Sequence, residues 1–467
     1  MKASGVQFGT SGARGLVEAM DAGVCYAYAT AFWQALGHGA EVVLGHDLRP
    51  SSPAIARACA AAFGALGVRV RYAGALPTPA LALYARGLGA PALVVTGSHI
   101  PFDRNGIKFY GPDGEISKRD EQAMLAVTVE LPESISPAAL PAPERAAEDQ
   151  YLRRYLDFFG AGCLAGMRVA VYEHSSVGRD VLRRILEALG AQVLALGRTD
   201  IFVPIDTEAV GPDDVARARA WAAQHAFDAI LSTDGDADRP LIGDERGQWL
   251  RGDIVGILCA QFLQADVVVT PVSSNSAVEL CGAFGQVLRT AIGSPYVIEA
   301  MEGAGGAGGV VAGYEANGGF LLGSAVERGG RRLEALPTRD AVLPMLALLC
   351  MARRDGIKLS ELAPRLPARY THSDRLQAFP LAHSRAILAG LAGDAAATAA
   401  LMAPDAGAVD RVDHTDGYRV TFGSGETVHL RPSGNAPELR CYAEAGSAQR
   451  AQLLCEACLA RLDAARR

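Results

Sequence analysis

The stretch from Asp228 to Arg239 reads DAILSTDGDADR, a short apolar run that ends in a loop of alternating aspartates. Two further apolar runs, at 92–96 and 309–313, also end in polar loops that contain glycine. Each is the last of a set in which such runs alternate with longer helical patterns, as is typical of βαβ units. Because ligands bind at the carboxyl ends of strands in open α/β sheets, we expect the three loops to share one central cleft.

The alternation of expected strands and helices recurs along three quarters of the chain. The first set has a helix over 53–66, and the strands of the three sets are expected at 41–44, 68–72 and 92–96, at 167–172, 192–196 and 228–232, and at 266–270, 287–290 and 309–313. Proline- and alanine-rich stretches at 131–150 and 363–371 are expected to be linkers.

The last part of the chain has a different pattern. Short antiparallel strands are expected at 411–420, 426–430 and 439–444, with turns at Asp416-Gly417 and at 423–425 and a closing helix from 448. The predicted fold is therefore α/β, with three similar mixed α/β domains and a C-terminal α+β domain. The expected domain bounds are 1–145, 146–252, 253–365 and 366–467.

Composition excludes several classes of protein. The 467 residues carry a formal net charge of −7 and no long run of Lys or Arg, so a protein that tracks duplex nucleic acid is not expected. The N-terminus lacks the apolar run of a signal peptide, and no stretch approaches the roughly 20 apolar residues that cross a bilayer. The nine cysteines are scattered, and the Cys455–Cys458 pair is expected to be buried rather than metal-bound or redox-active. A cytoplasmic protein with reduced thiols is therefore expected.

The aspartate loop predicts a metal site. Asp234, Asp236 and Asp238 alternate with small residues, so the backbone can turn all three carboxylates toward one hard cation such as Mg²⁺. An EF-hand is excluded because Arg239 stands where that loop needs glycine, and because a strand precedes the loop. A solvated acidic turn is the remaining alternative.

Other loops offer a nucleophile and anion-binding groups. Ser98 lies at a strand end between Gly97 and His99, and Lys108, one of very few lysines, follows closely. The sequence contains no G-x-S-x-G elbow, the motif that would indicate an α/β-hydrolase. Phosphate nests are possible at 8–15, which contains Arg14, and at 431–437, although the second could also be a plain hairpin loop. The G-x-G-x-x-G match at 303–308 lies between a helix and a strand, the reverse of the dinucleotide-binding context.

These motifs, in this order, resemble the α-D-phosphohexomutase superfamily, which includes phosphomannomutases, phosphoglucomutases and phosphoglucosamine mutases. The family's serine loop, Thr-Ala-Ser-His-Asn-Pro, is similar to Thr96–Pro101, and its metal loop, Asp-Gly-Asp-Gly-Asp-Arg, is similar to Asp234–Arg239 with Ala237 in place of glycine. Its sugar loop, Gly-Glu-x-Ser-Gly, resembles Tyr314–Gly318, and its phosphate loop, Arg-x-Ser-Gly-Thr-Glu-Pro, resembles Arg431–Pro437. The resemblance covers the chain from Phe8 to Glu444.

The resemblance implies an isomerase of carbohydrate metabolism that uses Mg²⁺ and a phosphorylated Ser98. The phosphoserine would give its phosphoryl group to a hexose phosphate and recover the other phosphate from a hexose 1,6-bisphosphate, which also serves as activator. Asp234, Asp236, Asp238 and the phosphoserine would hold the metal, Lys108 would act as general acid or base, and Arg14, His99 and Arg239 would stabilise charge. The implied substrate-binding residues are Tyr314, Glu315, Asn317, Arg431, Ser433, Gly434, Asn435 and Arg440.

Departures from the family's motifs bear on the substrate. Ile100, Asn317 and Ala436 replace residues that would lie near the nucleophile, the sugar or the phosphate. Mannose phosphates are the expected substrates, with glucose phosphates as further ones. A phosphoglucosamine mutase, a phosphosugar-binding protein without turnover and a serine-dependent phosphatase are the alternatives. The expected partners are hexose phosphates, without nucleic acid or membrane, and the expected state is a monomer or homodimer.

Overall fold

The computed structural model describes residues 4–9, 11–37, 39–305, 308–433 and 437–465. The chain divides into two compact units: residues 1–268 with 293–363, called the first unit, and residues 269–292 with 364–467, called the second unit. Both contain sheets covered by helices, so the α/β class is confirmed. No helix among the described residues is long and apolar enough to span a membrane.

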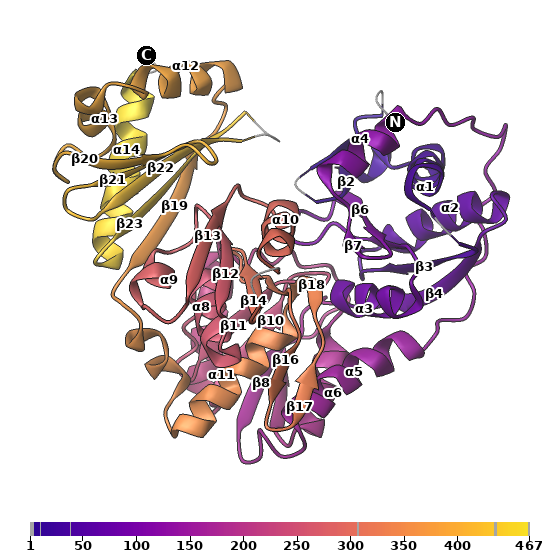
Figure 1. Ribbon diagram of the computed structural model, residues 1–467. Helices are drawn as coiled ribbons and strands as arrows, with labels where there is room; N and C mark the ends of the chain where they lie inside the picture. The colour runs from indigo at the N-terminus through magenta and orange to yellow at the C-terminus, as the bar shows by residue number, and fades with distance from the viewer. Residues whose placement is uncertain (1–3, 10, 38, 306–307, 434–436, 466–467) are drawn as a thin grey trace. The chain divides into compact units, whose positions relative to one another are not determined.

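The first unit begins with a seven-stranded sheet of order β1-β2-β6-β5-β3-β4, in which β7 pairs with β6. β3 runs parallel to β4 and β5, and β6 runs antiparallel to β5. Helices α1 (Ala22–Leu36) and α2 (Ser52–Ala65) lie on one side and α3 (Thr78–Leu88) on the other (Figure 1). The strands are β1 (Gln7–Phe8), β2 (Ala13–Leu16), β3 (Glu41–His46), β4 (Arg69–Ala75), β5 (Ala92–Val95), β6 (Arg104–Gly111) and β7 (Gly114–Glu115).

Aromatic packing fixes the position of β6. Phe109 is buried against Phe32 of α1, with ring centroids 5.2 Å apart. Burial of a side chain of this size stabilises the fold by about 1.5–3 kcal/mol. Because successive side chains of a strand point to opposite faces, Lys108 is directed away from this aromatic cluster.

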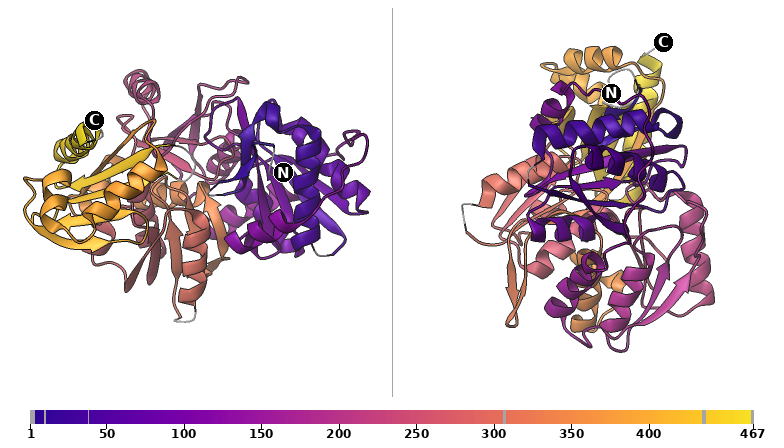
Figure 2. Two further views of the ribbon diagram at one scale, coloured as in Figure 1. Left: turned by 90° about the horizontal axis from the view of Figure 1, so that it is seen from above. Right: turned by 90° about the vertical axis from the view of Figure 1, so that its right-hand side faces the viewer.

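Two smaller sheets complete the first unit (Figure 2). One has the order β11-β10-β8-β9, in which β8 is parallel to β9 and β10 while β11 is antiparallel to β10. The other contains β14, β15 and β18 in antiparallel array, and a separate hairpin pairs β16 with β17. The strands are β8 (Arg168–Tyr172), β9 (Gln192–Leu196), β10 (Ala229–Thr233), β11 (Pro240–Asp244), β14 (Val311–Tyr314), β15 (Phe320–Leu322), β16 (Val326–Arg328), β17 (Arg331–Leu333) and β18 (Leu336–Asp340).

Further helices of the first unit pack around these strands. They are α4 (Lys118–Ala126), α5 (Ala146–Phe159), α6 (Arg179–Ala188), α7 (Pro212–Gln224), α8 (Gly252–Leu263), α10 (Ser294–Ala304) and α11 (Val342–Asp355). Tyr151 of α5 donates a hydrogen bond of 2.7 Å to Asp340 at the end of β18, and Tyr155 donates to the other oxygen of that carboxylate. These bonds anchor the strand that carries Arg339.

The second unit contains an antiparallel sheet of order β19-β23-β22-β21-β20. Its strands are β19 (Tyr370–Leu376), β20 (Val409–Asp413), β21 (Tyr418–Phe422), β22 (Thr427–Pro432) and β23 (Leu439–Ala445). Helices α12 (Leu381–Leu391), α13 (Ala395–Met402) and α14 (Ala448–Ala465) accompany it, and α9 (Ala277–Leu280) and β13 (Gln286–Thr290) belong to the same unit, while the boundary falls within β12 (Val267–Pro271). Cys455 and Cys458 are fully buried in its core, which confirms the interpretation as small buried residues.

Several expected elements differ from the structure. The stretch 411–420 is not one strand but the end of β20, a turn and the start of β21. The expected linker 363–371 runs into β19, and α5 begins within the expected linker 131–150. Strand β6 was not among the expected strands. The four domain bounds stay a prediction.

Candidate active site

Three loops of the first unit meet, as their positions after strands predict. They follow β5, β10 and β14 and contain Ser98, the aspartate triad and Glu315. Ser98 Oγ donates a hydrogen bond of 2.5 Å to Asp234 Oδ2. A Cβ at Gly235 would lie 2.8 Å from the carbonyl oxygen of Ser98, so this approach requires glycine.

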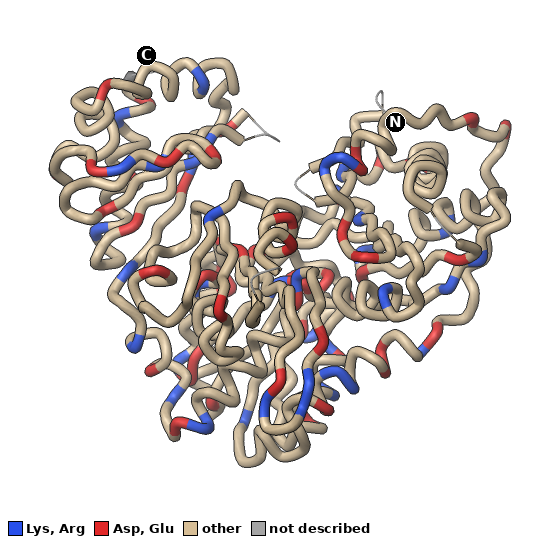
Figure 3. Tube along the Cα trace, in the orientation of Figure 1, with Lys and Arg blue, Asp and Glu red and all other residues tan. Residues whose placement is uncertain are grey.

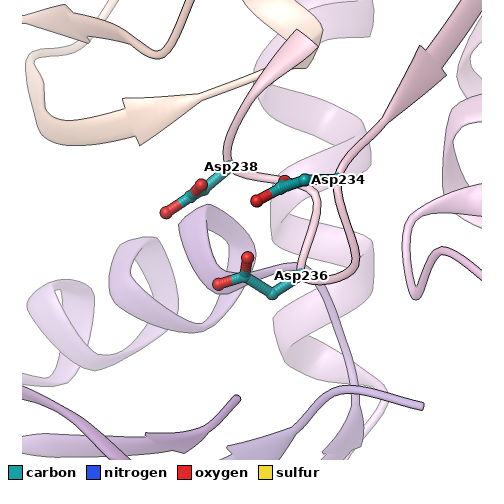
Figure 4. A group of neighbouring side chains, drawn as sticks. All are labelled: Asp234, Asp236 and Asp238. Atoms are coloured by element: carbon teal, nitrogen blue, oxygen red, sulfur yellow. The ribbon is translucent and has the colours of Figure 1, made fainter. Parts of the chain in front are cut away.

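The aspartate triad forms a compact group of carboxylates. Asp234, Asp236 and Asp238 are at most 1% exposed, and each offers an oxygen within 4.8 Å of the others. Figure 4 shows the three carboxylates converging from one loop. Among the described residues, this is the only group of three or more potential ligand residues so close together. Burial and the two neighbouring carboxylates raise the pKa of Asp234.

The chemistry of this donor set fits a hard divalent cation. Oδ1 of Asp236 and Oδ1 of Asp238 are buried, and neither has a hydrogen-bond partner among the described residues. A buried carboxylate oxygen without a donor is costly, and a bound cation would satisfy it. The triad therefore has free acceptors where a metal ion would need them.

Cationic side chains offset the charge of the triad. Lys108, 2% exposed, places Nζ 2.6 Å from Asp236 Oδ2 and 2.5 Å from Asp238 Oδ2. Arg339 Nε donates to the same Asp238 oxygen at 2.9 Å. Burial opposes ionisation of Asp238, but Arg339, Lys108 and Arg239 outweigh it and lower the pKa of this carboxyl. The site thus keeps the Asp238 carboxylate ionised in a buried position.

The Ser98 loop is held by residues of the β3–α2 connection. The Arg49 guanidinium donates to the carbonyl oxygens of Ser98 at 3.0 Å and Pro101 at 2.7 Å, and also to those of Ile100 and Arg104. Asp47 Oδ2 accepts a hydrogen bond of 2.8 Å from Thr96 Oγ1. Ser98 has φ +53°, a conformation that few residues other than glycine adopt. This scaffold therefore holds the serine in a strained conformation that turns its hydroxyl toward Asp234.

The residues predicted to stabilise charge surround the same point. Arg239 Nη1 lies 2.5 Å from His99 Nδ1, and Ser98 Oγ lies 3.4 Å from that nitrogen. Burial and the neighbouring arginines lower the pKa of His99 far below its usual range, so the imidazole is neutral. Burial, Arg239 and Arg339 lower the pKa of Arg14 to about 10. His99 can therefore contribute a ring N–H but no positive charge.

The predicted sugar loop joins the triad through Arg339. This side chain, 2% exposed, bonds both Asp238 and Glu315, the latter at 3.2 Å. Tyr314 is buried, and Asn317 Oδ1 accepts from the backbone N–H of Gly319 at 2.9 Å. The Asn317 side-chain oxygen thus also stabilises its own loop.

The remaining predicted binding residues belong to the second unit. Arg431 Nε donates to Asp416 Oδ2 at 2.8 Å, and Arg440 forms an ion pair of 3.6 Å with Glu438. Ser433 is buried. Gly434 and Asn435 lie outside the described residues. The role of this loop in phosphate binding stays a prediction.

Sequence reasoning missed Asp47, Arg49, Thr78 and Arg339. Thr78 Oγ1 donates to Asp236 Oδ2 at 2.6 Å from the first turn of α3. Asp47 and Arg49 follow β3, so their place at a strand end was a signal that could have indicated them. Arg339 lies within β18, and no local pattern marks it.

We expect Arg339→Lys to reduce turnover about 10- to 100-fold, because a single ammonium cannot bond Asp238, Glu315 and Ser294 in the geometry of a guanidinium. Steady-state kinetics with a thermal unfolding curve measure this. Arg332→Lys is the control, since Arg332 is 54% exposed on β17 and pairs with Glu327 and Glu334. Equal activity of the two variants would contradict a positioning role for Arg339.

The geometry first defines a class: an α/β enzyme in which a serine oxygen lies beside a buried carboxylate site for a cation. The family models of phosphoglucomutase/phosphomannomutase match as follows: α/β/α domain I at residues 5–132, α/β/α domain III at 251–370 and the C-terminal domain at 385–460. The chain belongs to this family of phosphohexomutases.

Individual relatives refine the comparison. A phosphomannomutase of Salmonella muenchen is 47% identical over 98% of this chain and 96% of its own length. A phosphoglucosamine mutase of Anaeromyxobacter sp. (strain Fw109-5) is 31% identical over 76% of this chain and 78% of its own length. A solved structure from Thermus thermophilus shares the fold with a TM-score of 0.77 at 22% identity, covering 98% of this chain and 99% of that one.

Proposed function

We propose that the protein interconverts hexose 1-phosphates and hexose 6-phosphates, with mannose phosphates as preferred and glucose phosphates as further substrates. The observation that carries this proposal is the 2.5 Å contact of Ser98 Oγ with Asp234 inside the aspartate triad. The phosphomannomutase relative, at 47% identity, supports mannose over the glucosamine alternative, whose relative is 31% identical.

Ser98 carries the phosphoryl group in this proposal. A hydroxyl oxygen of the hexose phosphate forms a bond to phosphorus while the bond from phosphorus to Ser98 Oγ breaks, and the hydroxyl gives up its proton. Reversal from the other end of the hexose 1,6-bisphosphate returns a phosphoryl group to Ser98 and leaves the isomeric monophosphate. Added bisphosphate therefore activates enzyme whose serine is not phosphorylated.

Lys108 is the group proposed to handle that proton. It is one of few lysines in the chain, and its ammonium can lose a proton where a guanidinium cannot. Arg14 and Arg239 would stabilise negative charge on the transferring group, and His99 would donate its ring N–H. Positioning and charge stabilisation of this kind supply most of the catalysis of phosphoryl transfer.

Asp234, Asp236, Asp238 and the Ser98 oxygen are the residues that would hold Mg²⁺. The bound ion would neutralise charge on the phosphoryl oxygens. Lys108 Nζ contacts two carboxylate oxygens of the triad, so an ammonium and a divalent cation compete for them.

Other residues would recognise the sugar and its second phosphate. Glu315, Asn317 and Tyr314 are proposed to bind sugar hydroxyls. Arg431, Ser433, Gly434, Asn435 and Arg440 are proposed to bind the phosphate that is not being transferred. The structure holds all nine cysteines as free thiols, which supports a reducing, cytoplasmic location.

The test is an assay with three substrates. Purified protein receives Mg²⁺, a trace of hexose 1,6-bisphosphate and, in parallel, the 1-phosphates of mannose, glucose and glucosamine, and phosphorus NMR follows the 6-phosphates. Fastest conversion of the mannose compound is expected. Faster conversion of the glucosamine compound, release of inorganic phosphate, or binding without conversion would replace the proposal by the corresponding alternative.

Removal of divalent cations with EDTA is expected to abolish turnover and to lower the unfolding temperature, because a ligand at 100 times its dissociation constant adds about 2.7 kcal/mol of stability. Differential scanning calorimetry and the mutase assay measure both effects. Readdition of Mg²⁺ restores them, and Asp236→Asn should abolish the thermal shift. Full activity in EDTA would contradict the proposed metal site.

A further inference from the structure

A cavity of about 490 Å³ lies in the first unit, lined by none of the residues proposed for the mutase reaction. The end of α5, α8, the β16–β17 hairpin and the last turns of α11 contribute to it. Three phenylalanines form its apolar part. Its polar lining consists of two cysteines, Cys163 and Cys350, and four arginines, Arg328, Arg331, Arg353 and Arg354.

The arginines give this cavity a positive charge. Arg331 Nη1 donates to the carbonyl oxygen of Phe159 at 2.8 Å, and Arg353 Nη1 donates to that of Cys163 at 2.6 Å. Arg328 donates to a carbonyl oxygen at 3.0 Å and stacks on the Phe262 ring. Within the described residues, these three guanidiniums have no carboxylate partner, whereas Arg354 pairs with Asp355. Figure 3 shows the basic positions along β17.

Backbone geometry brings Arg331 against the end of α5. Gly160 ends that helix with φ +80°, and a Cβ there would collide with the Arg331 guanidinium. Arg353 lies one turn after Cys350 on α11 and bonds the carbonyl oxygens of Gly162 and Cys163. The turn that carries Cys163 is therefore fastened to the helix that carries Cys350.

The two thiols line the same cavity, on segments that Arg353 ties together. The neighbouring Cys350 side chain, together with Arg353 and Arg331, lowers the pKa of Cys163 despite partial burial. The Cys163 side chain and burial raise the pKa of Cys350. In contrast, burial raises the pKa of Cys25, Cys59 and Cys259, which lie in the core. A half-buried thiol among cations is the environment of a reactive cysteine.

We propose that Cys163 and Cys350 form a peroxide-reactive dithiol site, in which Cys163 is the thiol attacked first and Cys350 closes the disulfide. This inference does not depend on the proposed mutase reaction. The substrate of the site is a small hydroperoxide, which the cavity admits beside the half-buried Cys163.

The proposed reaction balances in two steps. The Cys163 thiolate attacks one oxygen of hydrogen peroxide, the O–O bond breaks, and a sulfenic acid and hydroxide form; the hydroxide takes up the proton that Cys163 released and becomes water. Cys350 then attacks the sulfenic sulfur, an S–S bond forms, and its thiol proton leaves with the hydroxyl as a second water. Two thiols are oxidised by two electrons, and one peroxide is reduced to two waters.

The experiment uses the reduced, full-length chain and a small molar excess of hydrogen peroxide at pH 7.5. The number of free thiols titrated after denaturation should fall by two from the initial nine. Non-reducing peptide mass analysis should find Cys163 linked to Cys350. In Cys350→Ser, dimedone should trap a sulfenic acid on Cys163. In Cys163→Ser, the fast loss of thiols should disappear.

Two controls separate this site from general oxidation. Cys281→Ser removes a half-buried cysteine of the second unit, whose sulfur donates to the Val278 carbonyl oxygen, and should oxidise like the parent. Arg353→Gln should shift the pH profile of Cys163 alkylation to higher pH, because a cation that favours the thiolate is lost. Retention of all nine thiols by the parent, or parent-like oxidation of Cys163→Ser, would overturn the proposal.

Discussion

Ser98→Ala is expected to lose steady-state turnover by about 10⁴-fold or more, because the variant has no oxygen to accept the phosphoryl group. The loop should keep its shape: Arg49 and Asp47 bond backbone groups and Thr96, none of which the substitution changes. Asp234 Oδ2 loses its donor, which costs about 1–3 kcal/mol in a buried site. The mutase assay and a chemical denaturation curve measure the two effects separately.

A matched control is Ser232→Ala. Ser232 is buried on β10, two residues before Asp234, and its hydroxyl donates to the Tyr172 carbonyl oxygen at 2.8 Å. This variant should lose stability comparably but remain active, and it should accept labelled phosphate from hexose 1,6-bisphosphate, whereas Ser98→Ala should not. Turnover by Ser98→Ala near the parent rate would exclude the phosphoserine mechanism.

The parts of the site that the sequence predicted are local ones. Asp234, Asp236 and Asp238 follow one buried strand and Ser98 follows another, so strand ends and small neighbours in the sequence were sufficient to indicate them. Ligand-binding loops of α/β sheets follow the carboxyl ends of strands, so the sequence also predicted that these loops would meet. The 2.5 Å contact between Ser98 Oγ and Asp234 Oδ2 shows that two of them do.

The parts that the sequence did not indicate act across long separations. Arg49 bonds carbonyl oxygens about 50 residues further along the chain, and Arg339 reaches Asp238 from β18. A buried arginine in a strand has no local pattern that distinguishes it from a surface arginine of an edge strand. Burial also changed the interpretation of His99, since neighbouring cations that come from other elements keep its imidazole neutral.

Lys108→Arg keeps a positive charge in place yet is expected to reduce kcat by about 10²-fold or more, the usual contribution of a positioned acid or base. The guanidinium stays protonated at all accessible pH values. Nζ lies 2.6 Å and 2.5 Å from its two carboxylates at a position only 2% exposed, so the larger group also strains the packing, typically by about 1–3 kcal/mol. A packing defect alone would be smaller in a variant with a smaller side chain.

Lys108→Gln, which is smaller than arginine, therefore distinguishes proton transfer from packing: it should lose kcat as strongly as Lys108→Arg although it relieves the crowding. Lys118→Arg is the control, because Lys118 is 36% exposed, bonds Glu121 at 2.8 Å and its substitution should leave the rate unchanged. If Lys108→Arg retains a rate within a few-fold of the parent, the proton must pass through another group. In that case Lys108 serves only to balance the charge of Asp236 and Asp238.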